Sequence, residues 1–415
     1  MNVLERDFFT DPDIIRDPTP YYAALRRIGP VVREPHHGVF LVSGLEEILA
    51  VYADHDAFSA VVSPLGPFMK VPEPAEGETL ADVVKHRRAE IPLSDLLPTL
   101  DPPEHTRHRA LINKLLTPNR LKENEEFMWS LADELIDEFA DRGEVELCKA
   151  YAGPFTLLVV ADLLGVPRED HETFREWLQG DGAPVAGDAT GAGSPQVFLN
   201  LYPYFTRYIE ARRTAPSDDV MSRLATVRFP DGALPAVGEV VRIAAILFAA
   251  GQETTARLIS TGMRTLAEQP ALANELRADP DAIPNFVEEC LRLESPIKGP
   301  FRLALRDTRL AGVEIPAGSL VMAMNGAANR DPRVFADGDG FDAKRSNARR
   351  NIAFGHGAHF CPGATLARAE ARISFERLLA RLDDLQLVDP SALSYVPSFL
   401  IRGLNELPMR FRRRS

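Results

Sequence analysis

The sequence predicts a mainly α-helical fold with small β-sheets, formed as one domain over residues 1–415. Two long stretches, 235–269 and 364–382, place apolar residues at helical spacing. Short runs of β-branched and aromatic residues predict a β-rich region near the N-terminus. No linker, repeat or block of like charge divides the chain, and an apolar content of 45% is enough for a large core.

The first half of the chain alternates short elements with turns. Residues 20–28 predict a helix that ends at Gly29-Pro30, and residues 31–34 and 39–42 predict a β-hairpin. Repeated prolines and glycines make residues 58–98 irregular, as loops that carry function often are. Helices are then predicted over 105–116, 153–166 and 168–178, followed by a small, Gly/Ala-rich connection over 180–195.

Residues 235–269 predict the longest helix, about 50 Å at about 1.5 Å per residue, and its apolar residues place it in the core. Its centre, residues 250–255 (AGQETT), departs from helix preference. Gly251 costs about 1 kcal/mol relative to alanine, and an acid is unusual in a buried helix. Glu253 and Thr254 could together relay protons through water. Alternatively, the threonines only bond to helix carbonyls.

Residues 354–363 (FGHGAHFCPG) place one cysteine among three glycines and a proline. Gly355 and Gly357 predict a tight turn, and the helical pattern that follows places Cys361 at a helix start. The helix dipole there favours an anion, so we expect a thiolate. One thiolate cannot build a zinc or iron–sulfur site, but it is enough for the axial ligand of a haem. The alternative is a buried cysteine in a glycine-rich turn.

This loop resembles the haem-binding signature of the cytochrome P450 family, with every fixed position present. The segment 250–255 resembles the oxygen-activation motif of the same family. The resemblance implies a P450 fold in which a long central helix lies over the haem, with the cysteine loop on the opposite face. It implies that Cys361 binds the iron, that Phe354 packs beside the sulfur and that His359 bonds a haem propionate. Ala250 and Gly363 are then also expected to contact the haem.

Further haem contacts follow from the same resemblance. His105 and Arg109 match a His-x-x-x-Arg pair that binds a propionate in the family, and their spacing puts them on one helix face. A solvated basic helix is the alternative interpretation. Arg302 is expected to contact the other propionate.

A Glu-x-x-Arg motif, Glu289 and Arg292, precedes the cysteine loop. In the family this pair is structural, and Arg345 is the expected third member. The expected substrate pocket is mostly apolar, which implies a small to medium hydrophobic molecule such as a terpenoid, aromatic or steroid; its residues are Phe68, Ile246, Ala249, Ala250, Pro300, Phe301 and Phe399.

The resemblance implies a haem-thiolate monooxygenase that uses heme b and O2 to hydroxylate or O-dealkylate its substrate. Electrons are expected from an acidic ferredoxin and an NAD(P)H-dependent ferredoxin reductase, docked near Arg107, Arg109 and Lys114. Two alternatives stay open: a haem-thiolate peroxygenase, and a haem sensor or carrier without turnover. The intact Glu253–Thr254 pair argues against the peroxygenase.

Composition restricts partners and location. The net charge of −13 argues against nucleic-acid binding, which needs a basic face. The longest apolar run, 243–250, is too short to span a membrane, and residues 1–20 lack a signal-peptide core. Three cysteines without a disulfide pattern fit a reducing compartment, so we expect a cytoplasmic protein with no membrane anchor.

Overall fold

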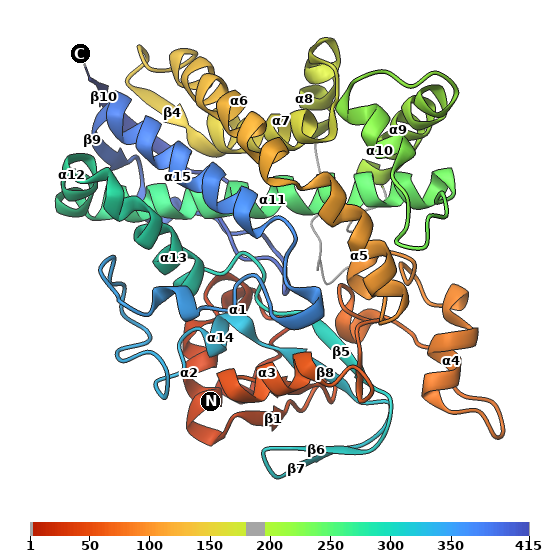
Figure 1. Ribbon diagram of the computed structural model, residues 1–415. Helices are drawn as coiled ribbons and strands as arrows, with labels where there is room; N and C mark the ends of the chain where they lie inside the picture. The colour runs from red at the N-terminus through yellow and green to blue at the C-terminus, as the bar shows by residue number, and fades with distance from the viewer. Residues whose placement is uncertain (1–2, 180–195, 415) are drawn as a thin grey trace.

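The computed structural model describes residues 3–179 and 196–414. Helix α11 (Val237–Glu268) crosses the middle of the molecule, with other long helices packed around it and the largest sheet in the lower half of the view (Figure 1). The mainly helical fold with small sheets predicted from the sequence is therefore confirmed.

Helix α11 organises the main hydrophobic core. Its 32 residues give a length of about 48 Å, and the Glu239 carboxylate caps its start by accepting the Ala236 amide at 2.7 Å. Its buried side chains share one core with residues of the surrounding helices. The other helices of eleven or more residues are α5 (Glu104–Leu115), α6 (Pro118–Asp137), α7 (Gly153–Leu164), α9 (Gln196–Thr214), α13 (Ile283–Leu293) and α15 (Ala364–Arg381).

Shorter helices connect these elements and cover the sheets. They are α1 (Pro12–Arg16), α2 (Thr19–Ile28), α3 (Leu45–Ala53), α4 (Leu80–His86), α8 (His171–Gln179), α10 (Val220–Thr226), α12 (Pro270–Ala278) and α14 (Asn325–Ala328). The predicted helix over 168–178 begins with a 3-10 turn at Arg168–Asp170 before α8.

The largest sheet has the strand order β1-β2-β8-β5-β3, in which β2 and β8 are parallel and the other neighbours are antiparallel. Its strands are β1 (Val31–Arg33), β2 (Phe40–Val42), β3 (Phe58–Ser59), β5 (Phe301–Ala304) and β8 (Leu320–Ala323). The predicted hairpin is confirmed as β1 and β2, which pair Val31 with Val42. Two smaller sheets contain β4 (Glu144–Glu146), β9 (Leu382–Leu387) and β10 (Pro408–Arg413), and β6 (Thr308–Leu310) and β7 (Val313–Ile315).

The predicted irregular segment over 58–98 contains only one α-helix, α4, together with short 3-10 turns. The predicted connection over 180–195 lies outside the described residues. Sequence analysis did not predict α6 or α9, although the buried side of α6, with Met128, Leu131 and Leu135, has helical spacing. Among the described residues, no helix combines the length and apolar content needed to cross a membrane.

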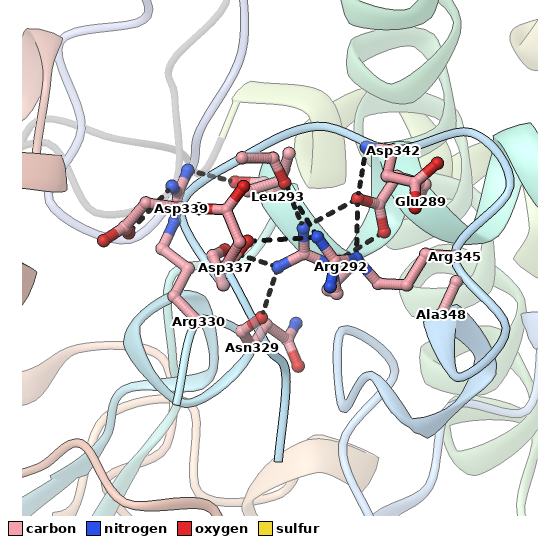
Figure 2. A network of polar contacts seen from close by, with 12 residues as sticks. Glu289, Arg292, Leu293, Asn329, Arg330, Asp337, Asp339, Asp342, Arg345 and Ala348 are labelled. Atoms are coloured by element: carbon pink, nitrogen blue, oxygen red, sulfur yellow. Dashed lines mark hydrogen bonds and ion pairs between the residues drawn. The ribbon is translucent and has the colours of Figure 1, made fainter. Parts of the chain in front are cut away.

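A buried ion-pair network fixes the segment that leads into the cysteine loop (Figure 2). Glu289 and Arg292 on α13 pair at 2.7 Å with both side chains 0% exposed, and Arg345 reaches the same carboxylate at 3.1 Å. Arg292 also donates to the carbonyls of Asn329 and Gly338. The expected three-membered lock is therefore confirmed, and it holds the irregular chain over 329–345 against α13.

Candidate active site

The loop that carries Cys361 is a shaped turn ahead of α15. Gly355 and Gly357 have φ angles of +71° and +68°, which side chains with a Cβ rarely adopt. The Cys361 amide donates to the Phe354 carbonyl at 2.9 Å, which closes the turn. Gly363 precedes the first residue of α15, and a Cβ there would lie 3.8 Å from the Cys361 Sγ atom. The glycines thus let the backbone wrap closely around the sulfur.

The charge state of the Cys361 thiol corrects one expectation. Burial raises the pKa of Cys361 above its ordinary value, against the opposing effects of the Gly363 amide and of Arg109 and Arg368. The sequence predicted a thiolate from the position of Cys361 at a helix start. In the structure, burial outweighs the effect of that position. A bound metal ion would supply the missing positive charge, since metal binding deprotonates a ligating thiol.

Two histidines from distant parts of the chain meet beside this loop. The rings of His105 on α5 and His359 lie 4.0 Å apart between centroids. Burial, together with nearby cations, lowers the pKa of His105 to about 4 and that of His359 to about 2. Among the residues that the structure describes, the buried His105 Nδ1 and His359 Nε2 atoms have no hydrogen-bond partner. Two unsatisfied ring nitrogens in one place indicate that a polar group belongs there.

Two arginines add positive charge to the same place. Arg302 is 2% exposed, and its charge, like that of Arg109, acts on both His105 and His359. Neither arginine has a carboxylate partner in the described part of the chain, whereas buried Arg292 has Glu289. Burial without a counter-ion lowers the pKa of Arg302 and of Arg109. Unpaired buried cations are costly, so this cationic cradle fits a ligand that carries carboxylates.

Helix α11 carries the predicted relay residues. Glu253 pairs with Arg257, one turn later, at 3.4 Å, and burial raises the pKa of Glu253. The Thr254 hydroxyl donates to the Ala250 carbonyl at 2.8 Å. The threonine thus makes the helix-carbonyl bond that sequence analysis kept as an alternative. Although Ala250 lies in the middle of the central helix, it is exposed, so this turn of α11 borders open space.

Thr156, which the sequence did not reveal, contacts the same turn of α11, and Gly251 sets how closely α7 packs there. The Thr156 hydroxyl on α7 donates to the Gln252 carbonyl at 2.8 Å and is fully buried. A Cβ on Gly251 would lie 3.1 Å from the Val160 side chain, so this glycine allows α7 to pack closely. Thr156 lies in a uniformly apolar helix, and no sequence signal distinguishes it from a core residue.

Comparison with known proteins identifies the family. The family model described as Cytochrome P450 matches residues 231–389. The cytochrome P450 monooxygenase PikC of Streptomyces venezuelae is 35% identical over 97% of this chain and 92% of its own length. The vitamin D(3) 25-hydroxylase of Pseudonocardia autotrophica is 34% identical over 96% of this chain and 95% of its own.

The chain belongs to the cytochrome P450 family. A solved structure, the substrate-free cytochrome P450 CYP150A6 of Mycobacterium marinum, superimposes with a TM-score of 0.92 at 44% identity, covering 99% of this chain and 100% of that one. This protein is thus a cytochrome P450 monooxygenase. The family implies a haem-thiolate cofactor, and the residues present fit it: the cationic cradle matches the carboxylates of a haem, and Cys361 lies beside it.

The P450 pocket residues predicted from the sequence divide into two groups. Phe301 and Phe399 are 0% and 2% exposed, with ring centroids 6.0 Å apart, and Phe68 lies 5.5 Å from Phe399 with 41% of its surface exposed. Ile246, Ala249 and Pro300 are half-buried. The structure thus brings the three aromatic rings together in one cluster, of which only Phe68 reaches the surface.

The basic residues expected to dock a redox partner of the P450 are mostly engaged within the chain. Arg107 stacks over the Phe229 ring at 3.4 Å and lies 3.5 Å from Asp231. Lys114 donates to the Arg228 carbonyl at 2.7 Å. Arg109 donates only to the side-chain oxygen of Asn113, at 3.4 Å, and is the one of the three without a carboxylate or backbone carbonyl contact in the described chain.

Glu370 on α15 is a buried carboxyl group without a cation partner. It is 1% exposed and pairs with no cation within the described residues, whereas buried Glu289 pairs with Arg292 at 2.7 Å. The Thr255 side chain hydrogen-bonds the carboxyl group of Glu370, and the Glu370 Oε1 atom has no hydrogen-bond partner in the described chain. Burial raises the pKa of Glu370 well above its ordinary value. Burial without a counter-ion thus favours the neutral carboxylic acid form of Glu370 in the folded protein.

We expect Glu370→Gln to flatten the dependence of stability on pH. An unfolded glutamate has a pKa of about 4.3. The stability contributed by neutral Glu370 is fully present below that pH and is lost as pH rises through the raised folded-state pKa. The glutamine amide cannot ionise. The unfolding free energy of the variant therefore rises relative to that of the wild type as pH increases, by at most about 1.4 kcal/mol per pH unit. Urea unfolding at several pH values between about 5 and 8 measures this gain, with the partly exposed Glu376→Gln as the control. If the unfolding free energies of wild type and Glu370→Gln change in parallel with pH, Glu370 is ionised in the folded protein.

Proposed function

We propose that Cys361 binds the iron of a heme b and that the protein hydroxylates or O-dealkylates a hydrophobic substrate with O2. One oxygen atom enters the substrate and the other leaves as water, which consumes two electrons and two protons. The observation that carries this proposal is the cradle beside the Cys361 loop. Within the described chain, Arg109 and Arg302 have no carboxylate partner, and two histidines each leave one buried ring nitrogen without a hydrogen-bond partner. His105, Arg109, Arg302 and His359 would hold the two propionates.

The bound haem supplies the redox chemistry, and we assign proton delivery to α11. Glu253 is half-buried, and burial raises its pKa, which favours the protonated form that a proton donor needs. Thr254 is the hydroxyl next to it, and its donor bond to Ala250 leaves the oxygen free to accept from a water. Arg257 keeps Glu253 in place, and it is itself held by the Leu404 carbonyl.

The substrate that we propose is an apolar molecule of small to medium size, such as a terpenoid, aromatic or steroid. Phe68, packed against the buried ring of Phe399, supplies exposed apolar surface. Ile246 and Ala249 are half-buried beside the exposed Ala250 on α11. A relative named for 25-hydroxylation of vitamin D(3), an apolar molecule, supports this class. Binding is measured by the spin-state shift of the haem with vitamin D(3), a monoterpene and a steroid as probes.

Electrons would come from an acidic ferredoxin and its NAD(P)H-dependent reductase. We propose that the ferredoxin docks around Arg109 together with Arg349 and Arg350, which are exposed and lie shortly before the Cys361 loop. Arg107 and Lys114 contribute less because they contact Asp231 and Arg228. All three cysteines are free thiols, which supports the cytoplasm as the location.

We expect Thr254→Ala to separate electron use from product formation. Without the hydroxyl, α11 would present no ordered proton donor next to Glu253, and we expect NAD(P)H consumption to yield hydrogen peroxide rather than product. The measurement is the ratio of product to NAD(P)H with a generic ferredoxin system and the probe that gives the largest spin-state shift. We expect this ratio to fall at least tenfold. This corresponds to a change of about 1.4 kcal/mol in the difference between the barriers that lead to product and to hydrogen peroxide.

Thr261→Ala is the matched control, because Thr261 lies on the same helix but is buried in the core. A coupling ratio in Thr254→Ala equal to that of the control would remove Thr254 from the relay. Product formation from hydrogen peroxide alone, at the rate seen with NAD(P)H, would favour a peroxygenase. The absence of product with every probe and both oxidants would favour a haem sensor or carrier.

A further inference from the structure

A second ion pair joins α13 to α15 next to the cysteine loop. Glu288, adjacent to the lock residue Glu289, is 2% exposed. Its carboxylate accepts two hydrogen bonds from Arg368, from Nε at 2.6 Å and from Nη2 at 3.2 Å. Such a two-point contact fixes the guanidinium in one orientation. The site residues predicted from the sequence include neither member of this pair.

Arg368 is fixed against the loop itself. Its guanidinium lies over the Phe354 ring, 4.6 Å from the centroid. The carbonyl of Phe354 accepts the Cys361 amide, so Arg368 contacts the residue that closes the turn around the sulfur. Arg368 is also one of the two cations whose charge acts on Cys361, and Arg109 is the other.

Glu288 holds the chain on both sides of the loop. Besides Arg368, which follows the loop, it accepts the Asn351 side-chain amide at 3.0 Å, and Asn351 precedes the loop. The Asn351 oxygen in turn accepts the Ala353 amide at 3.1 Å. Without Glu288, the guanidinium of Arg368, whose side chain is 35% exposed, would be free to turn toward water.

We propose that Arg368, positioned by Glu288 and Phe354, raises the reduction potential of the haem iron bound to Cys361. The inference rests on the proposed function. One-electron reduction adds a negative charge at the iron and its thiolate, and a fixed cation nearby stabilises the reduced form. Arg368 is therefore a positioning and electrostatic residue of the reaction, and not a catalytic one.

Potentiometric titration of the haem-loaded protein tests this proposal. We expect Arg368→Gln to lower the potential by about 59 mV, a tenfold change in the one-electron reduction equilibrium. Arg368→Lys keeps the positive charge and should recover at least half of that shift. Because Arg368 is partly exposed, the shift should shrink at high salt. A role limited to packing would leave the potential, and its salt dependence, unchanged.

Arg372→Gln is the matched control. Arg372 lies one turn further along α15 with similar exposure and also pairs with glutamates, Glu125 and Glu376, but it is not among the charges that act on Cys361. Equal shifts in Arg368→Gln and Arg372→Gln, or no shift in either, would overturn the proposal. The spectrum of the reduced, carbon monoxide-bound protein is recorded for each variant. A wild type without the thiolate band would refute the proposed function itself, whereas intact bands with equal potentials would refute only the role of Arg368.

Discussion

Cys361→Ala is expected to abolish the thiolate-type absorption band of the reduced protein with carbon monoxide, and with it all monooxygenase turnover. The substitution removes the one sulfur that the Gly363 amide, Arg109 and Arg368 surround. The cationic cradle at His105 and Arg302 stays intact, so we expect the variant to retain some haem. Its bound carbon monoxide should then absorb as in proteins without a thiolate ligand.

Cys148 and Cys290 provide the matched controls, because both are free thiols in the same chain. Cys290 is 2% exposed in the core, and the Cys148 thiol bonds the Ser260 hydroxyl at 3.2 Å. Burial raises the pKa of Cys148 to about 12, so it is a poor ligand near neutral pH. Cys148→Ala and Cys290→Ala should both keep the band. If Cys361→Ala keeps it, or either control loses it, the ligand assignment is wrong.

Arg292→Ala is expected to cost about 3–5 kcal/mol of unfolding free energy, because it leaves the fully buried carboxylate of Glu289 without its main counter-ion. Arg345 still reaches that carboxylate at 3.1 Å. The carbonyls of Asn329 and Gly338 lose their donors as well. A loss of this size is a large part of the total stability of an ordinary domain. We expect most of the variant to be recovered without haem.

Urea unfolding and the haem content after purification measure this effect. Arg309→Ala is the control, because Arg309 and Glu314 form an ion pair of similar length, 2.6 Å, with both side chains about two-thirds exposed. Solvent screens that pair, so its loss should not change the unfolding midpoint. Equal midpoints for Arg292→Ala and Arg309→Ala would show that the network over 329–345 does not depend on Arg292.

The sequence was informative where function requires a fixed local pattern. Gly355 and Gly357 ahead of Cys361 have positive φ angles, which favour glycine, so they occur as part of a recognisable loop. The pair Glu289 and Arg292 must lie one turn apart on a helix, and the spacing shows this directly. Helix α11 was predictable because it is the longest helix of the described chain, with 32 residues, and its apolar residues recur at helical spacing.

The sequence by itself determined the family, the single thiol of the site and the order of the motifs. Only the tertiary structure showed that His105 and His359, which are 254 positions apart, have ring centroids 4.0 Å apart. Each leaves one buried ring nitrogen without a hydrogen-bond partner in the described chain. Only the fold could bring Glu288 and Arg368 together or show that Arg107 and Lys114 have partners of their own. The physical reason is that burial and long-range pairing set the charges and pKa values of a site, as for Cys361 and Glu370, and local sequence contains neither.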